Sequence, residues 1–178
     1  GSSLVGSEMC IRDRMINHGI TSGALFMLVG FLYERRHTRN ISSFGGIKIT
    51  MPKYAAIFLF TSFASIGLPG LNGFVGEFMI LMGSYDHYKV LTSIAAFGVV
   101  LAAIYMLWAY QRIFTGPISN DKNENLNDLN IRETLSIAPL MLLMLFIGIY
   151  PSFIESFVIQ EAGFLSETIA LFLSLIHI

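Results

Sequence analysis

The chain contains an apolar run of 38 residues, 51–88, in which only three residues carry a formal charge. A helix of that length would extend about 57 Å, roughly twice the hydrocarbon thickness of a bilayer. The segment 67–73 is rich in glycine and contains a proline, so it can interrupt the helix. The run therefore predicts two membrane spans, near residues 51–67 and 70–86, with a break between them.

Three further apolar stretches, at residues 15–33, 90–114 and 135–154, predict one span each. Composition agrees, since 54% of the residues are hydrophobic and only 13% are charged, against about 25% charged in soluble domains. The sequence thus predicts an all-α fold, a polytopic transmembrane helix bundle of about five spans with one discontinuous helix near residues 67–77.

Glu77 lies inside the long apolar run, beside the helix break expected from Gly67, Pro69, Gly70 and Gly73. A charged group at the centre of a lone membrane helix costs about 2.5–3.5 kcal/mol, so such groups usually have a function. Desolvation disfavours the charged carboxylate, which lets a buried carboxyl exchange a proton near working pH. Backbone groups freed at the break can hold water that delivers the proton. Glu77 is therefore a candidate proton-path residue; alternatively, its carboxyl hydrogen-bonds a neighbouring helix as packing.

His18 heads the first span and could relay protons, because histidine titrates near neutral pH. Alternatively, it is a hydrogen-bonded residue at the membrane interface. The charged segment 33–39 follows the same span; it is a solvated loop by default, and a docking contact with a neighbouring subunit is the other possibility.

The net charge of -1 and the lack of a basic stripe exclude a nucleic-acid partner. No motif for a metal, nucleotide, flavin, haem or iron–sulfur cluster is present.

Both ends of the chain differ in kind from the rest. One DNA tag, translated from its two strands, can encode both MCIRDR at 9–14 and LSLIHI at 173–178. The two ends resemble a translated sequencing-library transposon adapter, so residues 1–14 and 173–178 are predicted artefacts and are excluded from fold reasoning. Cys10, the only cysteine, falls in this part, which leaves no thiol chemistry. The natural part then comprises the transmembrane residues 15–154 and a possible amphipathic segment, 155–172.

Charge in the loops gives a weak orientation. With five spans, six basic residues lie on one side of the membrane and three on the other. The first group is Arg35, Arg36, Arg39, Lys48, Lys53 and Lys89; the second is Arg112, Lys122 and Arg132. Cytoplasmic loops carry an excess of Lys and Arg, so the first side is expected to be cytoplasmic.

Three segments together resemble one known family: NHGITSGALF at 17–26, YERRHTR at 33–39 and SIGLPGLNGFVGEF at 65–78. The family is that of the proton-pumping, antiporter-like subunit M (mitochondrial subunit 4 type) of NADH–quinone oxidoreductase, respiratory complex I. The resemblance covers nearly all of residues 15–154. The combination of segments is specific, whereas the Gly-Pro-Gly run alone would not be.

The resemblance implies an intact protein of about fourteen transmembrane helices, of which this chain holds the last five. In the family the twelfth helix is discontinuous and carries a proton-channel glutamate, whose motif position is that of Glu77. The family's intramembrane histidine on the tenth helix is matched by His18. NADH, flavin, iron–sulfur clusters and quinone belong to other subunits, so this chain is expected to hold no cofactor. Expected partners are other membrane-arm subunits, membrane lipids and protons, in the inner membrane of a bacterium.

Three functions remain open at this point. In the first, the chain is part of a proton-translocating membrane subunit of NADH:quinone oxidoreductase. The chain then belongs to an enzyme but carries no redox centre itself. The second is a subunit of a multisubunit cation/proton antiporter, a secondary transporter without a redox role. The third is a structural membrane subunit that only braces its neighbours.

Overall fold

The computed structural model describes the backbone of residues 2–152 and the side chains of residues 14–152. Within this part every regular element is helical, which confirms the all-α prediction, and the helix is discontinuous beyond residue 66 as expected. The main helices are α1 (Ser2–Arg36), α2 (Ile47–Thr50), α3 (Pro52–Ile66), α4 (Asn72–Tyr85), α5 (Lys89–Phe114) and α6 (Ile131–Ile149). The expected amphipathic segment 155–172 and the adapter-like segment 173–178 lie outside the described residues.

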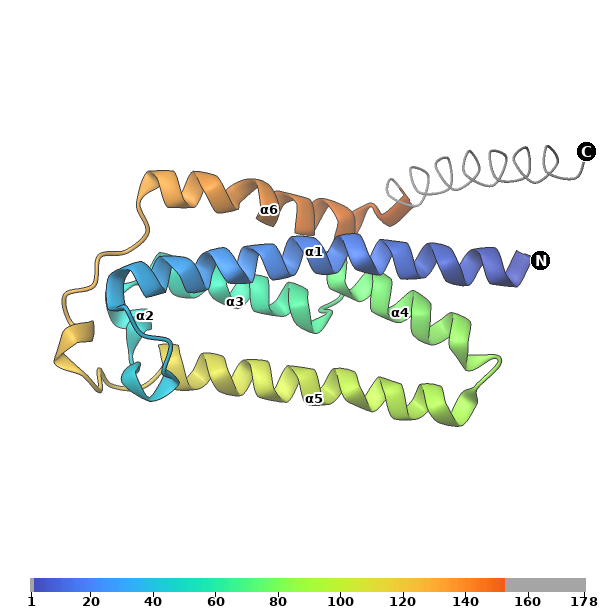
Figure 1. Cartoon of the computed structure of the whole chain (residues 1–178), viewed down its shortest axis with the longest axis horizontal. Coiled ribbons are helices and arrows are strands. Elements are labelled where there is room, and N and C mark those ends of the chain that lie inside the picture. The colour runs from blue at the N-terminus through green and yellow to red at the C-terminus, as the bar shows by residue number, and fades with distance from the viewer. Residues whose placement is uncertain (1, 153–178) are drawn as a thin grey trace, which may run out of the picture.

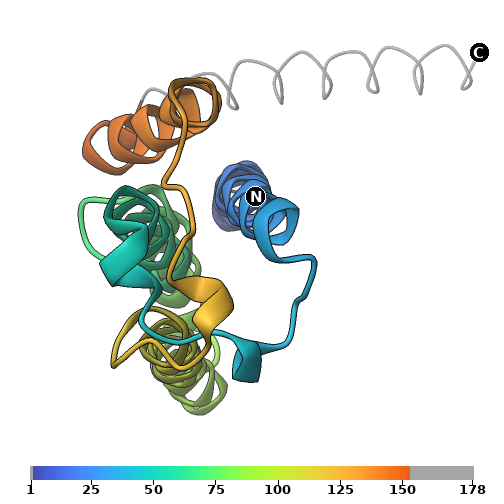
Figure 2. The ribbon, with the colours of Figure 1, turned by 90° about the vertical axis from the view of Figure 1, so that its left-hand side faces the viewer.

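Helices α3 and α4 form one broken membrane crossing. Figure 1 shows them end to end and running in the same direction, with α5 returning along the length of both, and Figure 2 shows them overlapping when seen along the bundle. With 15 and 14 residues, each half extends only about 21–22 Å, short of the roughly 30 Å of a bilayer core. The length of the apolar run predicts how much helix forms, but not the direction that the chain takes after the break.

The expected number of spans is therefore corrected. Three helices are long and apolar enough to cross a membrane alone, namely residues 14–36 of α1, α5 and α6. Together with the broken pair α3–α4 they make four crossings in the described part of the chain, rather than about five. Figure 2 shows α6 and α5 on opposite sides of the broken helix, with α1 beside it.

Hydrogen bonds join the two longest loops at one end of the bundle. The Gly46 N–H donates to Thr115 O at 3.3 Å, and Asn123 Nδ2 donates to Ser43 O at 3.2 Å. Both loops lie at the left end of Figure 1. In the five-span arrangement three crossings separate the two loops, which would put them on opposite sides of the membrane. Because the loops touch, the number of crossings between them must be even. It is even when α3 and α4 count as one crossing, followed by α5.

The basic residues therefore divide much more unevenly than the sequence predicted. Within residues 15–152, all basic residues except Lys89 lie at the end where the loops meet. These are Arg35, Arg36, Arg39, Lys48, Lys53, Arg112, Lys122 and Arg132. By the excess of Lys and Arg in cytoplasmic loops, this end is expected to face the cytoplasm.

Cysteine labelling tests the four crossings. In a cysteine-free background of the intact subunit, Ser42→Cys and Asn125→Cys are expected to react with a membrane-impermeant maleimide from the same side, the cytoplasmic one, because their loops touch. His87→Cys, in the turn between α4 and α5, is expected to react only from the other side. Labelling of Ser42→Cys and Asn125→Cys from opposite sides would restore the five-span arrangement.

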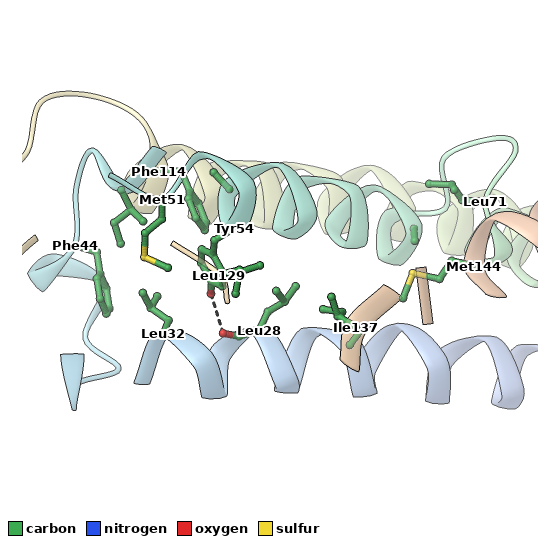
Figure 3. Packing of buried hydrophobic residues seen from close by; sticks show 14 residues of the cluster. Leu28, Leu32, Phe44, Met51, Tyr54, Leu71, Phe114, Leu129, Ile137 and Met144 are labelled. Atoms are coloured by element: carbon green, nitrogen blue, oxygen red, sulfur yellow. Dashed lines mark hydrogen bonds between the residues drawn. The ribbon is translucent and has the colours of Figure 1, made fainter. Parts of the chain in front are cut away.

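The hydrophobic core lies between α1, the broken helix and their neighbours. Figure 3 shows Leu28 and Leu32 of α1 facing Met51 and Tyr54 at the start of α3, with Phe114 of α5 behind them. The Tyr54 hydroxyl is fully buried and donates to Leu28 O at 2.9 Å, the dashed line in Figure 3. Burial of a hydroxyl requires such a partner. This packing fixes α1 against α3 and so sets where α1 passes the helix break.

Candidate functional site

The helix break, residues 67–71, begins where Gly67 leaves the right-handed helix. Gly67 has φ +84°, and the Leu68 N–H donates to Phe63 O at 3.0 Å, a hydrogen bond typical of a glycine-terminated helix. Gly70, with φ +91°, turns the chain a second time. Pro69 lies between the two glycines on the exposed part of the break. Helix α4 then begins at Asn72.

Two glycines allow close approaches at this break. A Cβ atom on Gly67 would lie 2.7 Å from Glu77 Oε2, so the absence of a side chain there makes room for the carboxylate. A Cβ atom on Gly73 would collide with Ala64 O, so only a glycine lets the first turn of α4 pack on the last turn of α3. Gly67 and Gly73 thus place Glu77 directly beside the break.

The Glu77 side chain points from the second turn of α4 toward α1 and is 18% exposed. Its Oε1 lies 2.8 Å from Nη1 of Arg14, which is 45% exposed. Arg14 is the last residue of the segment predicted to be adapter-encoded. The ion pair therefore shows the direction in which Glu77 points. If residues 1–14 are adapter-encoded, Arg14 is not the natural residue before Met15, and the pair itself is not a feature of the natural protein.

His18 lies on α1 one helical turn after Arg14, on an exposed part of the helix. The Ser22 hydroxyl lies 3.3 Å from a ring nitrogen of His18. The resemblance matched His18 to a histidine of the family's tenth helix. If the broken helix is the family's twelfth and is a single crossing, α1 takes the place of the eleventh, so that match is displaced by one helix.

A small cavity brings Glu77 and His18 together. Its volume is about 30 Å³, enough for one or two water molecules. It is lined by Arg14, Asn17, His18, Thr21, Ala64, Ser65, Gly73, Gly76 and Glu77. Side chains that lie 59 positions apart in the sequence thus face one space between α1, α3 and α4. We call this space the small cavity.

Glu77 also borders a larger, mainly apolar cavity of about 250 Å³ between α4 and α5. Its other lining residues are Arg14, Ile80, Leu81, Ala95, Gly98, Val99 and Ala102. The carboxyl therefore separates a small space lined by polar side chains from a wider space lined by apolar ones. Such a position suits a group that exchanges protons between two environments.

The described residues contain no cluster of three or more His, Cys, Asp or Glu side chains arranged to hold a metal ion.

The comparisons with known proteins bear on the same region. The protein-family model described as "NADH:quinone oxidoreductase/Mrp antiporter, TM" matches residues 5–104, which include the break, Glu77 and His18. That match covers more than half of the chain. The chain belongs to this family.

Curated members of the family include NADH-quinone oxidoreductase subunit M of Rickettsia bellii (strain RML369-C), 46% identical over 139 residues. The subunit M of Rhodobacter capsulatus is 41% identical over 145 residues. These alignments cover 78% and 82% of this chain but 28% of either relative, so the chain spans just over a quarter of their length. The resemblance to subunit M is confirmed.

Two solved structures have a similar fold. Respiratory complex I from Thermus thermophilus with bound NADH matches with a TM-score of 0.66 and 27% identity over 88% of this chain and 36% of that one. The Mrp complex from Dietzia sp. DQ12-45-1b matches with a TM-score of 0.73 and 16% identity over 84% of this chain and 36% of that one. At 16% identity, the second match supports a shared fold only.

Sequence reasoning missed two buried amides of this family member, Asn17 and Asn72, which are 3% and 0% exposed. Both stand within the segments that carry the family resemblance. A usable signal was present, because an amide inside an apolar span requires a hydrogen-bond partner. Their partner helices could not be read from the sequence.

An ionic cluster at the end of the bundle where the two loops meet was also missed. Arg35 Nη1 and Nη2 donate to Glu133 Oε1 and Oε2 at 2.8 and 2.7 Å, and Arg35 Nε donates to Asn127 O at 2.8 Å. The Asp128 carboxylate accepts from the backbone of α3, including the Tyr54 N–H at 3.1 Å. The charged segment 33–39 is therefore not only a solvated loop, because Arg35 joins α1 to the start of α6.

Proposed function

We propose that the chain is part of a membrane subunit of proton-translocating NADH:quinone oxidoreductase, and that it conducts protons across the membrane. Electron transport from NADH to quinone takes place in other subunits, which hold NADH, flavin, iron–sulfur clusters and quinone. The observation that carries the proposal is the small cavity, which joins Glu77 to His18 at a helix break. The partners are then the other membrane-arm subunits and membrane lipids.

In this proposal Glu77 takes up and releases a proton, and water at the break carries that proton to and from it. The carboxyl suits the task because it borders both the small cavity and the wider apolar one. His18, which also lines the small cavity, relays the proton. Gly67, Pro69, Gly70 and Gly73 form the break that gives water its place beside Glu77.

Two further parts of the proposal concern the chain as a whole. We place it in the inner (plasma) membrane of a bacterium as a multi-pass protein, because the named relatives are bacterial. Residues 15–154 form the C-terminal transmembrane part of the antiporter-like domain, residues 155–172 a possible amphipathic segment, and residues 1–14 and 173–178 are encoded by an adapter.

A second candidate function is that of a subunit of a cation/proton antiporter of the Mrp type. Its support is the fold, since the TM-score with the Dietzia complex is 0.73, against 0.66 with complex I. The sequence favours the oxidoreductase instead, because subunit M relatives reach 46% identity, against 16% for the Mrp structure. Deletion of the intact gene discriminates: loss of membrane NADH oxidation supports the oxidoreductase, and unchanged oxidation supports the antiporter.

The proposal predicts the effect of Glu77→Gln in the intact subunit. Glutamine keeps the shape of the side chain but cannot exchange a proton, so the protons pumped per NADH oxidised are expected to fall roughly tenfold. The measurement is acidification of inside-out membrane vesicles, together with NADH oxidation in the presence of an uncoupler.

Glu34→Gln is the matched control, because it makes the same chemical change at an exposed position outside both cavities. It is expected to leave pumping unchanged. If Glu77→Gln pumps as well as the unaltered enzyme, Glu77 is no proton-path residue, and a subunit that only braces its neighbours becomes the better account.

A further inference from the structure

Helix α3, the first half of the broken crossing, begins without a cap of its own. Met51 stands at the cap position, but its side chain makes no capping hydrogen bond, and Pro52, the first helical residue, has no backbone N–H. The first two backbone donors of α3 are therefore those of Lys53 and Tyr54. Donors at the start of a helix have no partner within the helix, so they need an acceptor from elsewhere.

The acceptor for both donors is the carboxylate of Asp128, in the loop before α6. Its Oδ2 accepts from the Lys53 N–H at 2.9 Å, and its Oδ1 accepts from the Tyr54 N–H at 3.1 Å. The negative charge of the carboxylate also interacts favourably with the positive end of the helix dipole. A side chain 75 positions after Lys53 in the sequence thus caps α3.

Arg35, near the end of α1, holds the loop that carries this cap. Its Nε donates to Asn127 O at 2.8 Å and its Nη2 donates to Asp128 O at 3.2 Å. The same guanidinium binds the carboxylate of Glu133 in the first turn of α6. One arginine therefore fixes both the backbone of Asp128 and the start of α6 on α1.

The far part of α6 holds the other end of α3, at the helix break. A Cβ atom on Gly148 would collide with Gly70 O, so the backbone of α6 lies directly against the break. Leu71, in the break, belongs to the same hydrophobic cluster as the fully buried Met144 of α6. Figure 1 shows α6 running from the end of the bundle where α3 begins to the level of the break. One continuous segment, 127–148, therefore holds α3 at both of its ends.

We propose that segment 127–148 is a clamp that fixes α3 at both ends and thereby sets the geometry of the break. The last turn of α3 packs closely on α4 and on the Glu77 carboxylate through Gly67 and Gly73, so it has little room to move. Asp128 is then a positioning residue for Glu77: it exchanges no proton, but it holds the helix against which Glu77 packs. The role in pumping rests on the proposed function, whereas the closing of the break does not.

The structural test measures how far the break is open to water. Leu71 is 5% exposed, so Leu71→Cys in a cysteine-free background of the intact complex is expected to react slowly with a small water-soluble thiol reagent. Addition of Asp128→Ala is expected to raise that rate several-fold, because α3 loses its cap. Asp128→Asn is expected to recover part of the protection, since an amide oxygen also caps a helix.

Asp121→Ala is the matched control for this test, because it makes the same change at an exposed position in the same loop. It is expected to leave labelling of Leu71→Cys slow. An equal rate in Asp128→Ala and in the unaltered background overturns the clamp. If Asp128→Ala does not assemble, Asp128→Asn supplies the same comparison.

The functional test separates positioning from a merely structural role. In assembled complex, Asp128→Ala is expected to lower the protons pumped per NADH oxidised several-fold at unchanged NADH oxidation, and to add no further loss to Glu77→Gln. Less assembled complex with an unchanged pumping ratio contradicts the positioning role. Lower pumping in Glu77→Gln, without faster labelling in Asp128→Ala, rejects the clamp while the proposed function stands. Faster labelling with unchanged pumping in Glu77→Gln rejects the proposed function while the clamp stands.

Discussion

Replacing Gly148 with valine is expected to prevent assembly of the subunit, the largest effect of any single substitution considered. Gly148 lies near the end of α6, and a Cβ atom there would collide with Gly70 O and with the Leu71 backbone. Backbone atoms of the break cannot move aside as a flexible side chain can. Overpacking usually costs about 1–3 kcal/mol where side chains can adjust, so the cost here should exceed that range.

The amount of assembled complex in membranes, measured on native gels, is the readout for Gly148→Val, and Gly148→Ala is expected to give an intermediate loss. Gly83→Ala is the matched control, because a Cβ atom on Gly83 of α4 meets no atom within 4 Å. Full assembly of Gly148→Val would mean that α6 does not touch the break in the intact subunit.

Loss of the Arg35–Glu133 ion pair is expected to have the second largest effect. The two side chains are only 13% and 15% exposed and are joined by two parallel hydrogen bonds, so removal of one leaves the other poorly solvated. Arg35→Leu is expected to destabilise the subunit by about 3 kcal/mol. The expected readout is a lower temperature of unfolding of the purified complex in detergent.

Arg35→Lys separates geometry from charge in this pair. Lysine keeps the positive charge but lacks the planar fork that bonds both carboxylate oxygens, so it is expected to restore only part of the stability. Arg132→Leu is the control, because it removes the same charge at an exposed position in the first turn of α6. A lysine variant as stable as the unaltered protein would show that charge alone holds the helices.

Much of the fold could be predicted from the sequence, because bilayer thickness and hydrophobic length leave little choice. The break was also readable, since Gly67, Pro69 and Gly70 disfavour a continuous helix. The direction of the chain after the break was not. It depends on Gly73 packing on Ala64, a contact between two helices that spacing alone does not reveal.

The candidate site could be predicted in part. Glu77 stood out because a carboxyl in an apolar run is rare. The structure puts it beside the break, where it lines the small cavity together with His18. Asn17 and Asn72 were not singled out, because an amide carries no charge and its burial depends on a neighbouring helix. Arg35 was not singled out from the other charges of segment 33–39, because its partner Glu133 lies on α6, far away in the sequence.

The contact of Gly148 with the break has a consequence for the proposed proton route. The backbone of α6 closes the flank of the break at Gly70 and Leu71, whereas both cavities that touch Glu77 open on the flanks of α1 and α5. The α6 side of the break is thus closed by backbone. In the proposed function, a proton bound for Glu77 then arrives across the faces of α1 or α5, and a change that loosens α6 is expected to let water reach the break from a third side.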